Sequence, residues 1–333
     1  MWNEQKIEKI LQEALIREYG QDQGSNYYSD YTTARNYLVG EIFSEIKGKE
    51  PNLSDHSAEH VANVLKNVWY LLGENPDILT PLELYCLCLI VLFHDAGNIE
   101  GRHNHNNKIA GIYNTIRNRN AKYNQERFIV LKAARAHCGF AIDNTRDTLK
   151  DVDKITNIDG NPIRLQELAS ILRFADELAE GPQRTSDYMC KTGAYTKESQ
   201  LFHQYASITN IFIDRHGERI ALTYNIDILS SNNQTIENFK NLMQFTYQRI
   251  IKLDEERRYT KHYSELLLPF KKTEIKFNFL IDGIPTEFDI PIICMEDLFP
   301  IPTEGLPKQE ILLEGHPELN LDKIVEKLNI SQI

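Results

Sequence analysis

Histidine and aspartate residues gather in one stretch of the chain. Six of the ten histidines fall between positions 56 and 137, and they form a candidate set in chain order: His56, His60, His94 followed by Asp95, His103, His105, His137, and further on Asp176. Imidazole nitrogens and carboxylate oxygens that converge from several helices suit Mn²⁺, Fe²⁺, Co²⁺, Ni²⁺ or Mg²⁺ with water in the open positions. Cys-rich structural zinc sites have a different ligand set. The pattern therefore predicts a divalent metal centre.

The dipeptide His94-Asp95 closes a segment, residues 81 to 95, that is apolar almost all round. Thr80 followed by proline is a typical helix start, so the segment is expected to be a buried helix. An unpaired carboxylate at the end of such a helix is costly, and a metal or another fixed cation gives a physical reason for Asp95. Asp176 repeats this situation in a second apolar helix.

The elements that must position these residues are helices. Apolar residues recur at helical spacing from position 1 to about 178, for example at Val61, Val64 and Val68. His60 shares that inward face, which places His56 on the outer rim of the same helix and favours His60 as the first ligand. Residues 1–190 are therefore predicted to form a helical domain, with the motifs in 53–184.

Strand patterns appear after about position 181. A first β-hairpin is predicted from 204–213 and 218–228, and a second from 274–281 and 286–293 with Asp282-Gly283 as its turn. A long helix is expected over 234–263 and a short closing helix over 317–328. The fold class is thus mainly α, a helical bundle with a smaller C-terminal α+β part, 191–333, that packs on it and is not independent.

Composition narrows the range of functions. A formal net charge of −11 and a pI near 5.5 disfavour sequence-independent binding to nucleic acid, while a small anionic substrate stays possible at a metal site. The five cysteines lack paired zinc spacing and are expected to be reduced, which indicates a cytoplasmic protein. The N-terminus has no signal-peptide pattern and no apolar run reaches bilayer length, so no membrane role is predicted.

The ordered set His, His-Asp, His, His, Asp resembles the HD superfamily of metal-dependent phosphohydrolases over roughly Leu53 to Arg184. The motifs that carry the resemblance are "LSDHSAEHVANVL", "LFHDAGN" and "ILRFADELAEGPQR". More narrowly, they look like the bacterial HD branch that is associated with defence or signalling operons. The resemblance implies an HD-type helical bundle and an antiviral-defence context.

Carried over residue by residue, the resemblance implies that a first metal is held by His60, His94, Asp95 and Asp176. His105 and His137 match positions that bind a second ion in two-metal members, or that supply a general acid in one-metal triphosphohydrolases. His56 is an alternative opening ligand. A metal would lower the pKa of bound water, and the resulting hydroxide would attack phosphorus. Arg102, Lys108 and Arg184 are candidates to bind the phosphate.

The substrate class stays open at this point. No Gly-Tyr-Pro follows His137, which disfavours the two-metal cyclic-dinucleotide branch, and Glu180 stands where deoxynucleotide triphosphohydrolases usually have a tyrosine. Deoxynucleoside triphosphates are the first expectation, and cyclic or linear signalling nucleotides the second. A low-turnover nucleotide-sensing or oligomeric binding module is the alternative outside catalysis. We expect a homo-oligomer that takes a small nucleotide.

Overall fold

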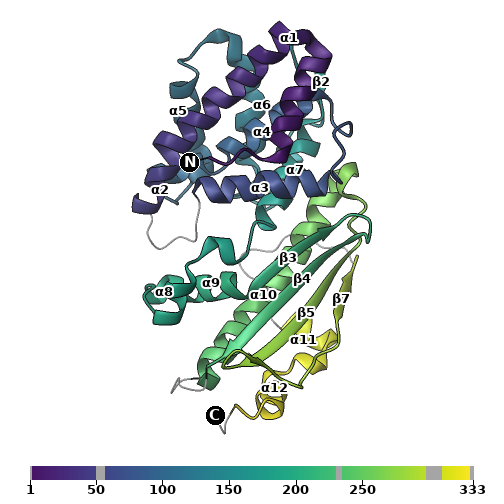
Figure 1. The fold of residues 1–333 in the computed structure, drawn as a ribbon. Helices are drawn as coiled ribbons and strands as arrows, with labels where there is room; N and C mark the ends of the chain where they lie inside the picture. The colour runs from purple at the N-terminus through teal and green to yellow at the C-terminus, as the bar shows by residue number, and fades with distance from the viewer. Residues whose placement is uncertain (1, 50–56, 230–234, 298–309, 331–333) are drawn as a thin grey trace. The chain divides into compact units, whose positions relative to one another are not determined.

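A computed structural model describes residues 2–49, 57–229, 235–297 and 310–330 (Figure 1). Contacts between Cα atoms divide the chain into two compact units. The first unit contains Met1–Ala179 and Tyr259–Leu268, and the second contains Glu180–Arg258 and Pro269–Ile333. Residues 180–190, which we predicted to belong to the helical domain, group with the second unit. Residues 259–262, the last turn of the longest helix of the second unit, group with the first unit.

The first unit is a bundle of helices. They are α1 (Lys6–Tyr37), the π-helix Leu38–Phe43, α2 (Ser44–Lys49), α3 (Ala58–Leu71), α4 (Pro81–Phe93), α5 (His105–Ile116), α6 (Asn124–Arg135) and α7 (Leu165–Glu177). Helix α1 is broken at Gly20, whose φ of 78° takes it out of the helical region, so its two halves fold back on each other. At Gly24 a Cβ would lie 2.5 Å from the Leu15 carbonyl oxygen, which shows how closely the two halves approach.

Helix α4 is the core of this unit, as the sequence predicts. Thr80 and Glu83 form a reciprocal capping box at its start, and His94 is its C-cap. Every residue from Leu82 to Phe93 is buried. Contrary to the expectation that no apolar run reaches bilayer length, the stretch Pro81–Glu100 is long and apolar enough to cross a bilayer, but 94% of its most apolar window is buried, as in a core helix.

The first unit also holds a small hairpin that we did not predict. Strands β1 (Thr156–Ile158) and β2 (Asn161–Ile163) pair antiparallel. Asp159 and Gly160 between them both have positive φ, which is the two-residue turn typical of a tight hairpin. The dipeptide Asp-Gly was the available signal, and each strand is only three residues long.

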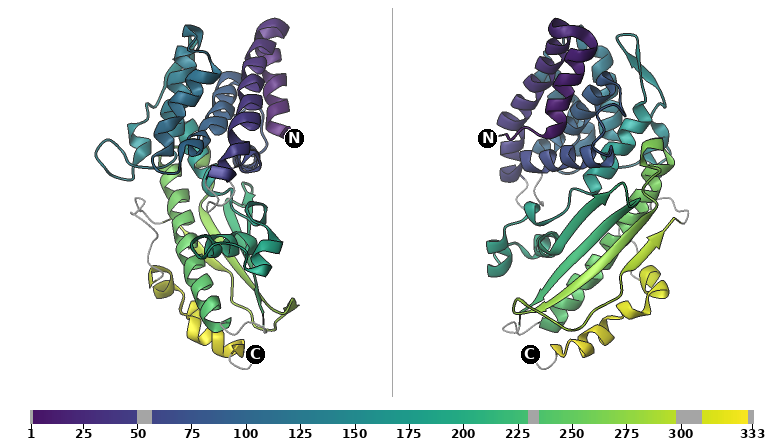
Figure 2. Two further views of the ribbon diagram at one scale, coloured as in Figure 1. Left: turned by 90° about the vertical axis from the view of Figure 1, so that its left-hand side faces the viewer. Right: turned by 45° about the vertical axis from the view of Figure 1, so that its right-hand side comes forward.

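The second unit contains a five-stranded sheet. Its strands are β3 (Thr209–Asp214), β4 (Arg219–Ile228), β5 (Lys272–Ile281), β6 (Ile284–Pro285) and β7 (Ile293–Glu296). β3 and β4 form the first predicted hairpin, whereas β4 and β5 run parallel and are joined through α10 (Thr235–His262). Helix α10 lies along one face of the sheet (Figure 2), where Tyr247 meets Phe277 with ring centroids 6.1 Å apart.

Two strand predictions were wrong in part. Residues 204–208 are the end of α9 (Lys197–Ile208), because Tyr205 and Ile208 bury a helical face there and β3 begins only at Thr209. In the second hairpin, β6 is two residues long and no strand covers 286–292. Pro285 still pairs with Leu280 and the Thr286 N–H donates to the Phe279 carbonyl oxygen at 3.0 Å, and strand pairing with β5 then resumes only at β7.

The remaining elements of the second unit are short. They are α8 (Asp187–Thr192), α11 (Glu310–Gly315) and α12 (Leu321–Lys327), with 3₁₀ turns at Pro182–Arg184 and Pro317–Leu319. The predicted closing helix over 317–328 is therefore two pieces. The predicted fold class, mainly α with a smaller α+β part, is confirmed.

Candidate metal centre

Four side chains from three helices converge in the first unit. His60 lies on α3, His94 and Asp95 follow α4, and Asp176 lies on α7, and one ligand atom from each falls within 4.8 Å of all the others. His60 Nε2 is 3.1 Å from Asp176 Oδ1, and His94 Nε2 is 3.4 Å from Asp95 Oδ2. The structure thus brings together the four residues that the HD resemblance gives to a first ion.

The His94 ring is oriented by its own helix. Its Nδ1 lies 2.7 Å from the Val91 carbonyl oxygen, so Nδ1–H donates to the backbone and Nε2 is the ring nitrogen that faces Asp95 and Asp176. His94 Nε2 is buried and has no hydrogen-bond partner within the described residues. Such an atom among carboxylate oxygens fits a divalent cation, because metal-ligating histidines commonly donate their other ring N–H to a carbonyl in this way.

An ion pair joins the N-terminal ends of α4 and α7, which are the ends away from His94 and Asp176. It fixes the position of one helix along the other. Glu83, in the first turn of α4, accepts hydrogen bonds at 2.7 Å from Nε and Nη2 of Arg164, the residue before α7. It also accepts the backbone N–H groups of Thr80 and Arg164. Both helices are 13 residues long, and His94 and Asp176 stand at their far ends.

A second group of potential ligands lies beside the first. It contains His105 on α5 together with His137 and Cys138, which follow α6. Nδ1 of His105 lies 3.2 Å from the Arg102 carbonyl oxygen and Nδ1 of His137 lies 2.6 Å from that of Ala134. With both Nδ1 atoms donating to backbone carbonyl groups, the two Nε2 atoms face each other at 3.2 Å. An approach this close requires a proton or a metal ion between the two nitrogens.

Asp95 stands between the two groups and faces both. Its Oδ2 is 3.5 Å from His60 Nε2, and its Oδ1 is 3.1 Å from His105 Nε2 and 3.7 Å from His137 Nε2. The carboxylate is 2% exposed. One carboxylate therefore offers an oxygen to each set of imidazoles.

Gly97 allows His105 to reach this position. A Cβ on Gly97 would lie 2.0 Å from the His105 carbonyl oxygen, so the turn after Asp95 and the start of α5 touch through backbone atoms alone. Any side chain at position 97 would push the start of α5 away from Asp95.

A model of the family described as HD-CE matches residues 50–253, which is more than half of the chain. The chain belongs to the HD-CE family. Comparisons of the HD-CE chain with curated proteins and with solved structures gave no match. Its HD-type domain and its His/Asp cluster together support a metal-dependent phosphohydrolase in general.

The electrostatics of the HD-CE site favour a cation. Burial alone would lower the pKa of His94, but the carboxylates of Asp95 and Asp176 outweigh burial and raise it to about 10. Burial would raise the pKa of Asp176, but the rings of His60 and His94, whose Nε2 atoms lie 3.1 and 3.6 Å from its Oδ1, hold it well below its usual range. For His137 burial and the charge of His94 prevail and lower the pKa to about 3. The carboxylates thus concentrate negative charge in a buried place.

The candidate phosphate-binding residues differ in what they contact. Arg102 Nη1 donates to Asn98 Oδ1 at 3.2 Å and lies 3.7 Å from Asp95 Oδ1, with 46% of its side chain exposed, so it borders the site. Lys108 Nζ donates to the carbonyl oxygens of Glu100 and Gly101, which occupies it in fixing the loop before α5. Arg184 belongs to the second unit, where it is buried and paired with Glu180.

Two further histidine predictions have different outcomes. His56 lies outside the described residues, so no contact of His56 decides between it and His60 as the opening ligand. His103, a member of the candidate set, is exposed and contacts the Asn104 side chain, so it does not join the metal-ligand groups.

Sequence reasoning missed two residues near the HD-CE site. Cys138 joins the second ligand group, and its position next to His137 was the signal. Arg173 precedes Asp176 by one turn and donates to Thr148 Oγ1 at 2.7 Å, and Thr148 in turn donates to the carbonyl oxygen of Ala136, the residue before His137. Arg173 therefore helps to position the segment that carries His137.

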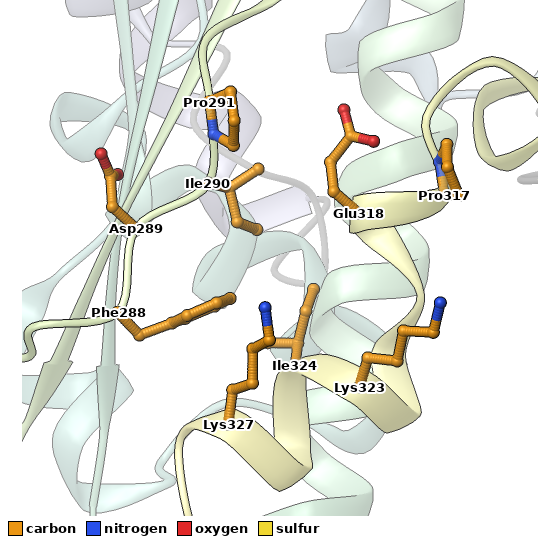
Figure 3. A pocket seen from close by; sticks show the side chains of 9 residues that line it. All are labelled: Phe288, Asp289, Ile290, Pro291, Pro317, Glu318, Lys323, Ile324 and Lys327. Carbon is orange, nitrogen blue, oxygen red and sulfur yellow. The ribbon is translucent and has the colours of Figure 1, made fainter.

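A separate cavity of about 300 Å³ lies in the second unit (Figure 3). Phe288 and Ile290 border it on one side, and Ile324 and Lys327 of α12 on the other. Lys327 lies over the Phe288 ring at 5.5 Å from its centroid. The residues around this cavity include no histidine or cysteine, and the two metal-ligand groups belong to the first unit.

Proposed function

We propose that this protein is a two-ion phosphohydrolase that cleaves nucleotide phosphate bonds. The first ion position is His60, His94, Asp95 and Asp176, and the second includes His105 and His137, with Asp95 serving both. The observation that carries the proposal is the placement of the two Asp95 oxygens, Oδ2 beside His60 and His94 and Oδ1 beside His105 and His137. A divalent pair supplies Lewis-acid stabilisation of phosphoryl oxygens and an activated water nucleophile.

The protein's own residues orient the imidazole rings and keep the ligand side chains away from solvent. The backbone carbonyls of Val91, Arg102 and Ala134 hold three imidazoles with Nε2 directed into the site. His60, His94 and Asp95 are at most 2% exposed, so charges there act in a medium that screens them weakly. If only one ion binds, we propose His105 as the group that delivers a proton from Nε2 to a leaving group, since burial and the charge of His94 lower the pKa of His137 and disfavour this role for it.

Deoxynucleoside triphosphates are the first substrate class that we propose. The formal net charge of −11 disfavours phosphate polymers, whereas a small polyanion meets positive charge locally from bound metal and from Arg102. Phosphodiester signalling nucleotides are the second class. The shared carboxylate favours them, because two-ion sites stabilise both the attacking and the leaving oxygen of an in-line displacement.

The test is a hydrolysis panel with the full-length protein. Ribo- and deoxynucleoside triphosphates, cyclic dinucleotides and linear dinucleotides are incubated with Mn²⁺, Mg²⁺, Co²⁺ or Ni²⁺, and products are resolved by chromatography. Release of tripolyphosphate and nucleoside establishes the first class, and cleavage of phosphodiesters alone establishes the second. Asp95→Ala is the inactive control, and Asp143→Ala, an exposed aspartate of the same unit, is the matched control that keeps activity.

If no substrate turns over with any of these ions, hydrolysis is rejected and a nucleotide-sensing module takes its place, which equilibrium dialysis with the same nucleotides detects. Homo-oligomer formation stays a prediction, and light scattering of the purified protein tests it. The defence context implied by the resemblance also stays a prediction.

A further inference from the structure

The second ligand group differs from the first in containing sulfur. Cys138 Sγ lies 3.7 Å from His105 Nε2, and the ligand atoms of His105, His137 and Cys138 all fall within 4.8 Å of one another. The first group, His60, His94, Asp95 and Asp176, offers only nitrogen and oxygen. The two positions therefore present different donor chemistry to an incoming ion.

We propose that Cys138 is a thiolate ligand of the second ion, and that this position takes a zinc-like ion such as Zn²⁺, Co²⁺ or Fe²⁺ in preference to Mg²⁺. The inference rests on the two-ion centre proposed above and adds a ligand and a selectivity to it. The thiol proton leaves to solvent as the metal–sulfur bond forms. Thiolate selects borderline and soft ions, while Mg²⁺ prefers oxygen ligands.

The segment that carries Cys138 is held in place by the helix that carries His105. Asn106, the next residue on α5, donates from Nδ2 to the carbonyl oxygens of Arg135 and Cys138 at 3.2 and 3.3 Å. Gly139 has a φ of 89°, and a Cβ there would lie 2.9 Å from the same Nδ2. One amide thus fixes both ends of the turn after α6 and keeps Cys138 beside His105.

The other cysteines have different surroundings. Cys86 and Cys88 are buried within α4, Cys190 contacts Thr185 Oγ1 at 3.2 Å, and Cys294 is exposed on β7. Within the described part of the chain, Cys138 is the cysteine that joins a group of candidate metal ligands. It is 33 residues from His105 in sequence, so its position beside that ring is a product of the fold.

The test uses Co²⁺ as the probe in full-length protein that has been stripped with a chelator. A thiolate bound to Co²⁺ gives a sulfur-to-metal charge-transfer band in the near ultraviolet, which nitrogen and oxygen ligands do not give. We expect the band in the wild type, its loss in Cys138→Ser, and its retention in the matched controls Cys190→Ser and Cys294→Ser. Circular dichroism checks that each variant is folded.

A conservative replacement separates ligation from structure. Cys138→His keeps a ligand atom, so it should retain two Co²⁺ ions per chain without the sulfur band, whereas Cys138→Ser should bind the second Co²⁺ at least about tenfold more weakly. After dialysis against equal Zn²⁺ and Mg²⁺, the wild type should keep one Zn²⁺ that Cys138→Ser loses. A sulfur band that survives in Cys138→Ser, or wild-type protein that binds two Co²⁺ ions without the band, overturns the inference.

These readouts need no substrate, so they separate this inference from the proposed function. A protein that shows the Cys138-dependent band but hydrolyses nothing in the panel keeps the thiolate ligand and loses the phosphohydrolase. A protein that hydrolyses nucleotides without the band keeps the function and loses the ligand. Wild-type protein that binds no Co²⁺ rejects the ligand together with the metal centre.

Discussion

At the scale of single residues, Asp95 is the side chain on which both ion positions depend. Its removal should release both ions, whereas His60→Ala should release the first and His137→Ala the second. Outer-sphere partners of metal ligands typically contribute 10–100-fold, so loss of the shared ligand should lower kcat/KM by more than about 100-fold. Elemental analysis of dialysed variants gives the metal content per chain. Equal loss of metal from all three variants would contradict the assignment of two separate positions.

Arg102 is the exposed cation beside Asp95, and its predicted role is to bind substrate phosphate. Arg102→Ala should raise KM about tenfold or more with little change in kcat, since a charge-assisted hydrogen bond contributes about 1.5 kcal/mol or more. Lys108→Ala is the matched control, because that ammonium binds backbone carbonyl groups and its loss should leave KM unchanged. Steady-state kinetics on the best substrate of the panel gives both constants. A kcat effect without a KM effect would reject the assignment.

The residue types predicted the metal cluster better than they predicted its surroundings. His94 and Asp95 could be singled out from the sequence because a buried helix that ends on charged residues is unusual, whereas the set that adds His60 and Asp176 was implied by the resemblance to the HD superfamily. Cys138 was missed despite its position next to His137, because a free cysteine is most often an inert core residue. Lys108 and Arg184 were chosen for their closeness in sequence, which says nothing about the carbonyl groups and the carboxylate that they contact.

At the scale of elements, the Glu83–Arg164 pair fixes α4 and α7 at the ends away from the metal ligands. Burial raises the pKa of Glu83, but hydrogen bonds from Arg164 and Thr80 outweigh burial and lower it. A carboxyl with a lowered folded-state pKa stabilises the fold above its ordinary value near 4.5, and this contribution disappears as the pH falls further.

Glu83→Gln should therefore be less stable near pH 7, by about 1–3 kcal/mol because Arg164 is partly exposed. It should also show a flatter decline in stability below pH 4.5 than the wild type. Denaturant unfolding between pH 3 and pH 7 measures both effects. Parallel pH profiles for the two proteins would show that Glu83 carries no linked proton.

The close backbone contact between Gly97 and the start of α5 predicts that a side chain at position 97 disturbs the second ion position. Gly97→Ala places a methyl group against the His105 carbonyl oxygen, so it should displace His105 and weaken the second ion position while the first is kept. Gly111→Ala is the matched control on α5, where the nearest atom to a new Cβ is Glu100 Oε1 at 3.9 Å. The control should be neutral or up to about 1 kcal/mol more stable. Calorimetric titration with Zn²⁺ distinguishes the two variants.

Helices and strands were predictable from the sequence where a single hydrophobic periodicity, helical or strand-like, dominated the segment. Helix α4 was predictable from its cap, its proline and its apolar run, and the β3–β4 hairpin from its alternation. The start of β3 was not, because residues 204–208 satisfy both a strand pattern and a helical one, and burial against the rest of the second unit decides between them. The parallel pairing of β4 with β5 depends on contacts between residues about 53 apart, which no local pattern encodes.

At the scale of the whole molecule, metal should stabilise the fold. The ligands come from α3, α5, α7 and the residues that follow α4 and α6, so an ion binds the folded first unit and not the unfolded chain. At 100 times the dissociation constant, binding adds about 2.7 kcal/mol, or roughly 5–10 °C in Tm for a unit of this size. Thermal unfolding with Zn²⁺ and with a chelator tests this. An unchanged Tm would show that the cluster does not bind the ion.

The single carboxylate of Asp95 also joins the two binding equilibria. An ion at one position adds positive charge near the other position and is bound by the same carboxylate. Each ion therefore changes the affinity of the chain for the other ion. Thermodynamic linkage requires the factor by which the affinity changes to be equal in both directions. The amount of doubly loaded protein then follows the product of the two free ion concentrations. Because the donor atoms at the two positions differ, full loading would require two different metal ions at the same time. A shortage of either ion would be enough to abolish activity.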